Sequence, residues 1–369
     1  LSLMMLPLVS CLSEFEDTSF TPEKAVMKWS GAPADMLVSD ASTMEVSLSS
    51  NLPWRITSCP TWITVSPKRG SGNETISVKI QRNRTVEQRT GTIRASVTPD
   101  QYAEFSIVQD GSASGTAMVY YVKTNGNPEA SGLSWTNATT FAKAIDSVAD
   151  GDTILVAAGT YKPELFLTGS DANDASNRTF EIHSNFTLIG GFPANADDAV
   201  TTLDDYDPSL NLTVLSGELE AGKSYHVVTV TASCVDGKKA VVKGFTITGG
   251  CNQAADGEQS VAINGTTFKN TLGGGVLAGP GVMDFEDCII TGNEAKNHAA
   301  GCYLMPGGVV SMKNVRISNN VSDINAGGIW NSGATLYMDG CTVSDNISGQ
   351  QAAGYYSIDS NGAPSVSRI

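Results

Sequence analysis

The chain has 369 residues, which is long enough for two or three domains or one elongated domain. Its 23 lysines and arginines stand against 38 aspartates and glutamates, which gives a net charge of −15. A surface of this sign repels phosphate backbones, so nucleic acid is excluded as an expected partner. Glycine is abundant and β-branched residues occur throughout, which predicts an all-β protein.

The first segment, residues 1–19, contains an apolar run that ends at Cys11 in the letters LSLMMLPLVSC. The run is too short to span a membrane. Its last four letters resemble the lipobox of a bacterial lipoprotein signal, and the acidic cluster that follows resembles the surface-export signal of Bacteroidetes lipoproteins. This resemblance implies a lipid anchor on Cys11 and a surface-exposed position on the outer membrane. The alternatives are a cleaved secretory signal or a buried strand.

Residues 20–111 show short runs in which apolar and polar side chains alternate. One run places Met44, Val46 and Leu48 between polar neighbours, and turn signals such as SPKRGSGN separate successive runs. Alternation with a period of two predicts strands with one buried face. We therefore expect an immunoglobulin-like β-sandwich here.

The letters LPWRITSCPTWITVSPKRGSGNETISVKI, followed by RTGTIRASV and FSIVQDG, resemble a BACON domain. The resemblance covers nearly all of this segment and implies an N-terminal module proposed to bind carbohydrate, although Cys59 departs from the usual pattern. Trp54 and Trp62 belong to the family pattern, and their neighbours favour packing in the core or rim over a platform for sugar.

The next segment, residues 112–117, predicts a short flexible linker. A single amphipathic helix follows, with Phe141, Ala144, Ile145 and Val148 on one stripe and Asn137 or Thr139 as its N-cap. We expect this helix to cover the exposed end of a stack of strands. The letters RTFEIHSNFTLIGGF from Arg178 resemble the first coils of surface proteins with a pectin-lyase-like, right-handed parallel β-helix.

Three stretches, CIITGN, VRISNN and CTVSDN, begin at Cys288, Val315 and Cys341, at spacings of 27 and 26 residues. A repeat of this length, in short strands separated by Gly, Asn and Asp, predicts one coil of a β-helix. Residues 118–369 are therefore expected to form a parallel β-helix, and the chain, which stops within a coil, is expected to be C-terminally incomplete.

Stacking places equivalent residues directly above one another, about 4.8 Å apart per coil. The inward columns are predicted to be Cys288, Val315 and Cys341; Ile290, Ile317 and Val343; and Phe285, Met312 and Met338. One outward column of alternating charge holds Glu286, Lys313 and Asp339. Asn293, Asn320 and Asn346 recur at a turn, which predicts a structural ladder of stacked amides.

A second outward column could carry the function. After a column of small residues, the sequence places Tyr303, Trp330 and Tyr356 at spacings of one coil, with Asn331 and Asp359 nearby. Aromatic faces with polar neighbours suit the C–H faces of sugars, so these residues form a predicted carbohydrate-binding surface. The alternative is that the rings fill the interior or are covered by a loop or another subunit.

Catalytic and metal-binding patterns are weak. The basic residues Lys313 and Arg316 and the carboxylates Asp284, Glu286 and Asp339 fit neither a lyase nor a hydrolase constellation on the aromatic face. No catalytic residue and no metal ligand is therefore assigned. His183, His226 and His298 are predicted to be surface or turn residues. Calcium binding by Asp204, Asp205 and Asp207 is the lesser alternative to a solvated loop.

Six cysteines other than Cys11 lack the spacing of a disulfide framework or a zinc site. Cys288 and Cys341 would lie about 9.6 Å apart, beyond disulfide reach, so we expect buried free thiols. The sequence as a whole predicts a surface lipoprotein that binds glycan or acts as an adhesin. A β-helix polysaccharide lyase or glycoside hydrolase and a structural stalk are the alternatives.

Overall fold

The computed structural model describes residues 24–39, 41–83, 88–111, 117–233, 237–360 and 362–368. These form two compact units, the first made largely of residues up to Gln109 and the second of residues from Asp110 onward. The predicted lipid anchor at Cys11, most of the predicted linker and Cys234 lie outside the described residues. Within the described ranges, no helix combines the length and the hydropathy that crossing a membrane requires.

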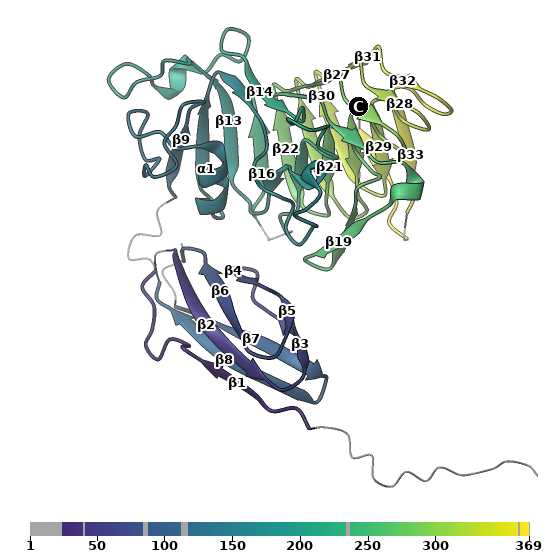
Figure 1. The fold of residues 1–369 in the computed structure, drawn as a ribbon. Helices are drawn as coiled ribbons and strands as arrows, with labels where there is room; N and C mark the ends of the chain where they lie inside the picture. Colours follow the sequence, from purple (N-terminus) through teal and green to yellow (C-terminus); the bar gives the residue numbers. More distant parts are fainter. Residues whose placement is uncertain are drawn as a thin grey trace, which may run out of the picture. The chain divides into compact units, whose positions relative to one another are not determined.

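The N-terminal unit is a sandwich of two four-stranded antiparallel sheets (Figure 1). One sheet has the order β1 (Met27–Ser30), β2 (Ser42–Ser50), β6 (Glu74–Ile80), β4 (Ile63–Ser66). The other has the order β5 (Arg69–Ser71), β3 (Pro53–Ser58), β7 (Arg89–Thr98), β8 (Gln101–Gln109). Trp54 is buried in the core between the sheets, and Trp62 packs at its rim beneath Arg89, whose guanidinium carbon lies 4.1 Å from the ring centroid. The predicted sandwich is confirmed.

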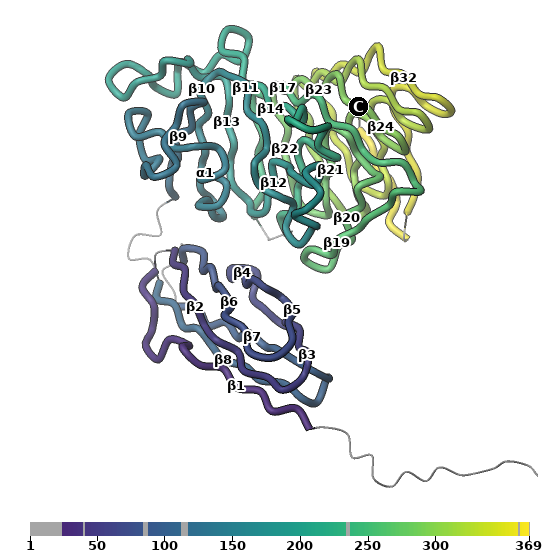
Figure 2. Tube along the Cα trace, in the orientation of Figure 1, coloured from purple at the N-terminus to yellow at the C-terminus, as the bar shows by residue number. Residues whose placement is uncertain are grey.

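The second unit is a stack of parallel coils, and Figure 2 traces these turns from teal to yellow. Sheet I contains β9 (Val119–Val122), β10 (Thr153–Ala157), β13 (Thr187–Phe192), β16 (Ala240–Lys243), β22 (Val282–Glu286), β26 (Val309–Lys313), β30 (Thr335–Asp339) and β34 (Val366–Arg368). Sheet II contains β11 (Gly159–Tyr161), β14 (Thr213–Ser216), β17 (Thr246–Thr248), β23 (Ile289–Thr291), β27 (Arg316–Ser318) and β31 (Thr342–Ser344).

Two further parallel sheets complete the coils. Sheet III contains β12 (Phe180–Ile182), β15 (Val228–Val230), β21 (Val276–Ala278), β25 (Cys302–Leu304), β29 (Ile329–Ser332) and β33 (Tyr355–Ile358). Sheet IV contains β18 (Cys251–Asn252), β24 (Glu294–Ala295), β28 (Val321–Ser322) and β32 (Ile347–Ser348). From β16 onward each coil passes through sheets I, II, IV and III in that order. The predicted all-β class, a sandwich followed by a parallel β-helix, is confirmed.

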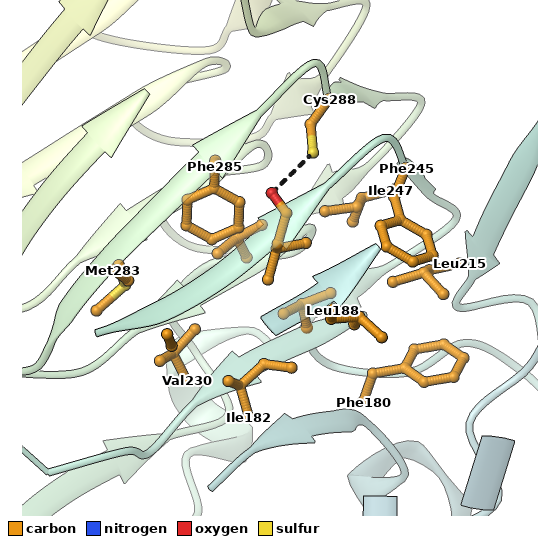
Figure 3. Packing of buried hydrophobic residues seen from close by; sticks show 14 of the residues in the cluster. Phe180, Ile182, Leu188, Leu215, Val230, Phe245, Ile247, Met283, Phe285 and Cys288 are labelled. Atoms are coloured by element: carbon orange, nitrogen blue, oxygen red, sulfur yellow. Dashed lines mark hydrogen bonds between the residues drawn. The ribbon is translucent and has the colours of Figure 1, made fainter. Parts of the chain in front are cut away.

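The register of the coils follows the repeat in the sequence. Phe285 pairs with Met312 and Met312 with Met338 in sheet I. In sheet II, Ile317 pairs with both Ile290 and Val343. These inward side chains join one continuous hydrophobic core, part of which is drawn in Figure 3. The charged column is also in register, because Lys313 pairs with Glu286 on one side and Asp339 on the other.

The single α-helix among the described residues, α1 (Phe141–Ser147), packs its buried stripe into this core beside the first strands. The predicted N-cap was wrong. Thr140 is the cap, because its side chain accepts a hydrogen bond from the backbone N–H of Lys143. The described residues also include three short 3₁₀ turns in connections between strands: η1 (Ala175–Asn177), η2 (Leu203–Asp205) and η3 (Ala255–Gly257).

An insertion between β18 and β21 forms a hairpin of β19 (Ser260–Ile263) and β20 (Thr266–Lys269). Asn264 and Gly265, with φ of 50° and 78°, make its two-residue turn. On its inner side Ile263 and Phe268 pack against Leu277 of sheet III. The hairpin therefore covers part of the outer face of sheet III.

Candidate functional site

The predicted aromatic column lies on the outer side of sheet III. Tyr303 of β25 pairs with Trp330 of β29, and Trp330 pairs with Tyr356 of β33. The Tyr303 and Trp330 rings stack with centroids 6.0 Å apart and an interplanar angle of 23°. Trp330 and Tyr356 are 4.5 Å apart and tilted by 50°. We call these three side chains the aromatic stripe.

The rings of the stripe face one another along the stack more than they face solvent. All three side chains are half-buried. The faces of Trp330 contact Tyr303, Tyr356 and the ring of His298, whose centroid is 4.5 Å away. Tyr303 also packs against the cluster beneath the hairpin, and burial raises the pKa of its phenol. The stripe is thus only partly open to solvent, and Tyr356 lies farther along the stack from the hairpin than Tyr303 does.

The structure contradicts the expectation that Asn331 contacts a ligand. Asn331 has no exposed surface and points into the coil, on the same side of β29 as Ile329. Its amide is used internally, since Oδ1 accepts from the Ala334 N–H at 2.9 Å and Nδ2 donates to the Ala334 carbonyl at 3.1 Å. Side chains alternate along a strand, so the residue after an outward ring must face inward.

A polar column runs beside the stripe and was missed by the sequence analysis. His298, Asn325 and Gln351 pair in parallel register, each five residues before a ring of the stripe. The Asn325 side-chain oxygen accepts from the Gln351 backbone N–H at 3.0 Å. The constant five-residue offset was visible in the sequence. The column places amide groups along one border of the aromatic surface.

Two ring nitrogens within this surface are buried without a hydrogen bond in the described part of the chain: Nε1 of Trp330 and Nδ1 of His298. Burial also lowers the pKa of His298, so the ring is neutral at pH 7. An indole N–H without an acceptor is costly. The centre of the stripe therefore contains two buried nitrogen atoms whose hydrogen-bonding capacity is not met by the described residues.

The residues considered for catalysis are divided between two faces. Glu286, Lys313 and Asp339 lie outward on sheet I, whereas Arg316 lies outward on sheet II. Asp284 forms an ion pair with Lys239, and Glu286 lies 3.3 Å from Lys243. Lys313 and Asp339 border an open hollow of about 380 Å³ with Tyr337 and Arg368. This hollow lies on sheet I, away from the aromatic stripe.

The acidic loop considered for calcium uses its carboxylates locally. One Asp205 oxygen accepts from the Thr202 N–H at 2.7 Å, and one Asp207 oxygen accepts from Ser209 N and Oγ. These bonds cap turns in the loop. Among the residues that the structure describes, no group of three or more metal-ligating side chains comes together.

The expectation that all three histidines are surface or turn residues was wrong for His226, which is 5% exposed and lies just before β15. The inserted hairpin covers it, and Nδ1 lies 2.6 Å from the Gly273 carbonyl oxygen. Burial lowers the pKa of His226 to about 4, against the opposing effect of hydrogen bonds to the Gly273 and Lys269 backbones. His183 and His298 are half-buried.

We expect His226 to make the protein less stable in acid. Its folded pKa is lowered, so its contribution to stability is complete above pH 6.5 and is lost as the pH falls towards about 4. The loss from this group should reach roughly 3 kcal/mol by pH 4. Urea unfolding at pH 7.5 and pH 4 should therefore show a smaller pH dependence in His226→Gln than in the unaltered chain. Equal pH dependence in the two proteins would contradict this assignment.

The predicted asparagine column forms a continuous hydrogen-bonded chain. Asn293 Nδ2 donates to Asn320 Oδ1 at 3.0 Å, and Asn320 Nδ2 donates to Asn346 Oδ1 at 2.9 Å. Each oxygen also accepts from the backbone N–H of the preceding asparagine. Asn293 and Asn320 are fully buried. These side chains satisfy the polar groups of the turn between sheets II and IV.

The described cysteines, which are Cys59, Cys251, Cys288, Cys302 and Cys341, are free thiols. Of these five cysteines, only Cys288 and Cys302 are fully buried, and the other three are half-buried. Burial raises the pKa of Cys288 to about 12, and the Cys288 thiol donates to the Val242 carbonyl at 3.5 Å (Figure 3). The expectation of burial was therefore wrong for Cys59, Cys251 and Cys341.

Comparisons with known proteins bear mainly on the first unit. Residues 34–114 match the family described as the viral BACON domain, which confirms the predicted BACON-like sandwich. Among solved structures, the pectate lyase Pel9A has 17% identity and a TM-score of 0.38, over 61% of this chain and 47% of that chain. A Bacteroides ovatus GH5 xyloglucanase in complex with a XXXG heptasaccharide has 10% identity and a TM-score of 0.22, over 64% and 58%. The chain thus spans about half the length of these structures. No curated protein matched.

Proposed function

We propose that this chain is a cell-surface glycan-binding protein whose contact surface is the C-terminal half of the outer face of sheet III. The observation that supports this most directly is the in-register pairing of Tyr303, Trp330 and Tyr356, all partly exposed, beside a polar column. Aromatic carbon next to amide groups is the combination that suits the mixed C–H and O–H surface of a sugar.

The spacing of the stripe suits an extended ligand. Ring centroids repeat at 6.0 and 4.5 Å along the stack. A chain of sugar units laid parallel to the stack would therefore meet a partly exposed ring at each unit and an amide of Asn325 or Gln351 at its border. The net charge of −15 disfavours a polyanionic chain, so a neutral glycan fits best.

The BACON unit is proposed to hold the β-helix away from the cell surface. Its resemblance also implies carbohydrate binding, but both tryptophans of its pattern are used in packing within this unit. Trp54 is buried, and the Trp62 ring is covered by Arg89. The lipid anchor on Cys11 belongs to the same proposal and would fix the chain to the outer membrane.

The proposal is tested by the double variant Trp330→Ala, Tyr356→Ala on an array of neutral glycans. Binding should weaken at least tenfold, because two of the three half-exposed rings of the stripe are removed. Tyr337→Ala is the matched control, since it removes an exposed tyrosine from sheet I. Cells that carry the full chain should also bind the glycan and lose this binding on Cys11→Ala, while the purified variant retains it.

Unchanged binding by the double variant would reject the stripe as the site. Unsaturated or hydrolysed oligosaccharides released by the purified chain would favour an enzyme, and no binding to any glycan would favour a stalk. If Trp330→Ala does not fold, Tyr356→Ala alone decides, because within the stripe the Tyr356 ring contacts only Trp330.

A further inference from the structure

A second hollow, of about 160 Å³, lies over the N-terminal half of sheet III, between the hairpin and the loop that joins β11 to β12. Neither its position nor its lining was apparent from the repeat. Its polar lining includes Asp171 and Asn177 from the loop, Gln259, Ser260, Lys269 and Asn270 from the hairpin and its ends, and His226, which lies two residues before β15. Val261 and Phe268 add carbon surface. The hollow therefore combines hydroxyl, amide and apolar walls.

The walls are held in place by contacts that do not involve a ligand. The loop is fixed to sheet III because Glu181, which is 6% exposed, accepts from Thr168 N at 2.9 Å and Oγ1 at 2.8 Å. On the hairpin side, Asn270 accepts from the Gln259 N–H at 2.7 Å and donates to the Gly257 carbonyl at 3.1 Å. A hollow fixed in this way needs little ordering when a ligand enters, which favours binding.

The charged side chains that line the hollow, Lys269 and Asp171, already accept or donate hydrogen bonds. Lys269 Nζ lies 2.8 Å from a Glu258 carboxylate oxygen, and this contact lowers the pKa of Glu258. One Asp171 oxygen accepts from the N–H and the side-chain amide of Asn173, both at 2.9 Å. His226 is neutral at pH 7 because burial lowers its pKa to about 4. An ionic ligand gains little from charged groups that already make hydrogen bonds, so the lining favours a neutral polar one.

Size limits the ligand further. The hollow has about five times the roughly 30 Å³ that one water occupies in the liquid, and it is smaller than the roughly 300 Å³ at which drug-sized pockets begin. From its size, its hydrogen-bonded charged groups and its mixed walls, we infer that the hollow binds one neutral sugar unit. This site is distinct from the aromatic stripe, and its lining shares no residue with it.

Ligand-observed NMR by saturation transfer tests the inference with the full chain. Glucose, galactose, mannose and xylose serve as probes, and galacturonate and glycine as charged comparators, each at about 10 mM. At least one neutral sugar should bind with a Kd on the order of 1 mM. Ser260→Phe, which fills the hollow from its rim, should weaken this binding at least tenfold, and Gln259→Ala should weaken it without filling the space.

Ala262→Phe is the matched control, because Ala262 lies in the same strand, is exposed and does not line the hollow. The Trp330→Ala, Tyr356→Ala variant should leave monosaccharide binding unchanged, which separates this site from the stripe. The inference is overturned if no neutral sugar binds the unaltered chain, or if only the charged probes bind. It is equally overturned if Ser260→Phe and Gln259→Ala, with unchanged melting temperatures, bind as the unaltered chain does.

Discussion

Replacing Asn320 by alanine is expected to lower the free energy of unfolding of the β-helix by about 4 kcal/mol. Asn320 is fully buried at the centre of the ladder. Its Nδ2 donates to the Ile290 carbonyl, the Ser318 carbonyl and Asn346 Oδ1, at 3.0, 3.2 and 2.9 Å. Its Oδ1 accepts from the backbone and side chain of Asn293, at 3.1 and 3.0 Å.

The large effect follows from what the substitution leaves behind. Alanine removes one side chain but leaves the Asn293 N–H and the Ile290 carbonyl buried without these partners, and each such group costs about 1–3 kcal/mol. Urea unfolding followed by far-UV circular dichroism measures the change. Arg316→Ala, an exposed substitution in the same coil, should stay within about 0.5 kcal/mol. A similarly small loss for Asn320→Ala would show that the ladder contributes little.

Gly301→Ala is expected to destabilise the β-helix by about 3 kcal/mol, although it adds a single methyl group. A Cβ at this position would lie 2.4 Å from the carbonyl oxygen of Gly328 in the next coil. That oxygen accepts the hydrogen bond of the Cys302 N–H at 2.8 Å. The coils would have to move apart or break this bond, because the obstructing atom belongs to the backbone.

Gly354→Ala provides the control in the same column. There the added Cβ would meet Val343 Cγ1 at 3.6 Å, which is an ordinary van der Waals contact. Neither glycine has a left-handed backbone, so the two substitutions differ in space and not in conformational preference. Thermal unfolding should therefore separate them clearly. Equal melting temperatures would show that the stack adapts to a methyl group at low cost.

The repeat in the sequence was sufficient to predict the fold of the second unit and the register of its columns. Equivalent letters recur every 26 or 27 residues, and in a parallel stack this spacing assigns Ile317 to the same column as Ile290 and Val343. The pairing of the three stripe residues followed from the same spacing. Strict alternation of side chains along the strand also places Asn331 in the interior. The wrong prediction that Asn331 contacts a ligand rested only on its position next to Trp330 in the sequence.

Features that depend on insertions were not predictable in the same way. His226 reads as a loop residue, and its burial comes from inserted segments that lie far from it in the sequence, among them the end of the hairpin. The hairpin itself had a signal, since Asn264 and Gly265 form the dipeptide that two-residue turns prefer. What the sequence did not reveal is where the hairpin packs, because an insertion has no equivalent residue in the neighbouring coil.

By itself, then, the sequence determined the periodic part of this protein: the sandwich strands, the coils, the inward columns and the residues of the stripe. Periodicity suffices there because each coil rests on a copy of itself, so spacing along the chain becomes position in space. Only the tertiary structure decided which outward residues remain accessible, how the stripe rings face one another and that a hollow exists beneath the hairpin. These depend on contacts between non-equivalent segments, such as Phe268 with Leu277, which no repeat encodes.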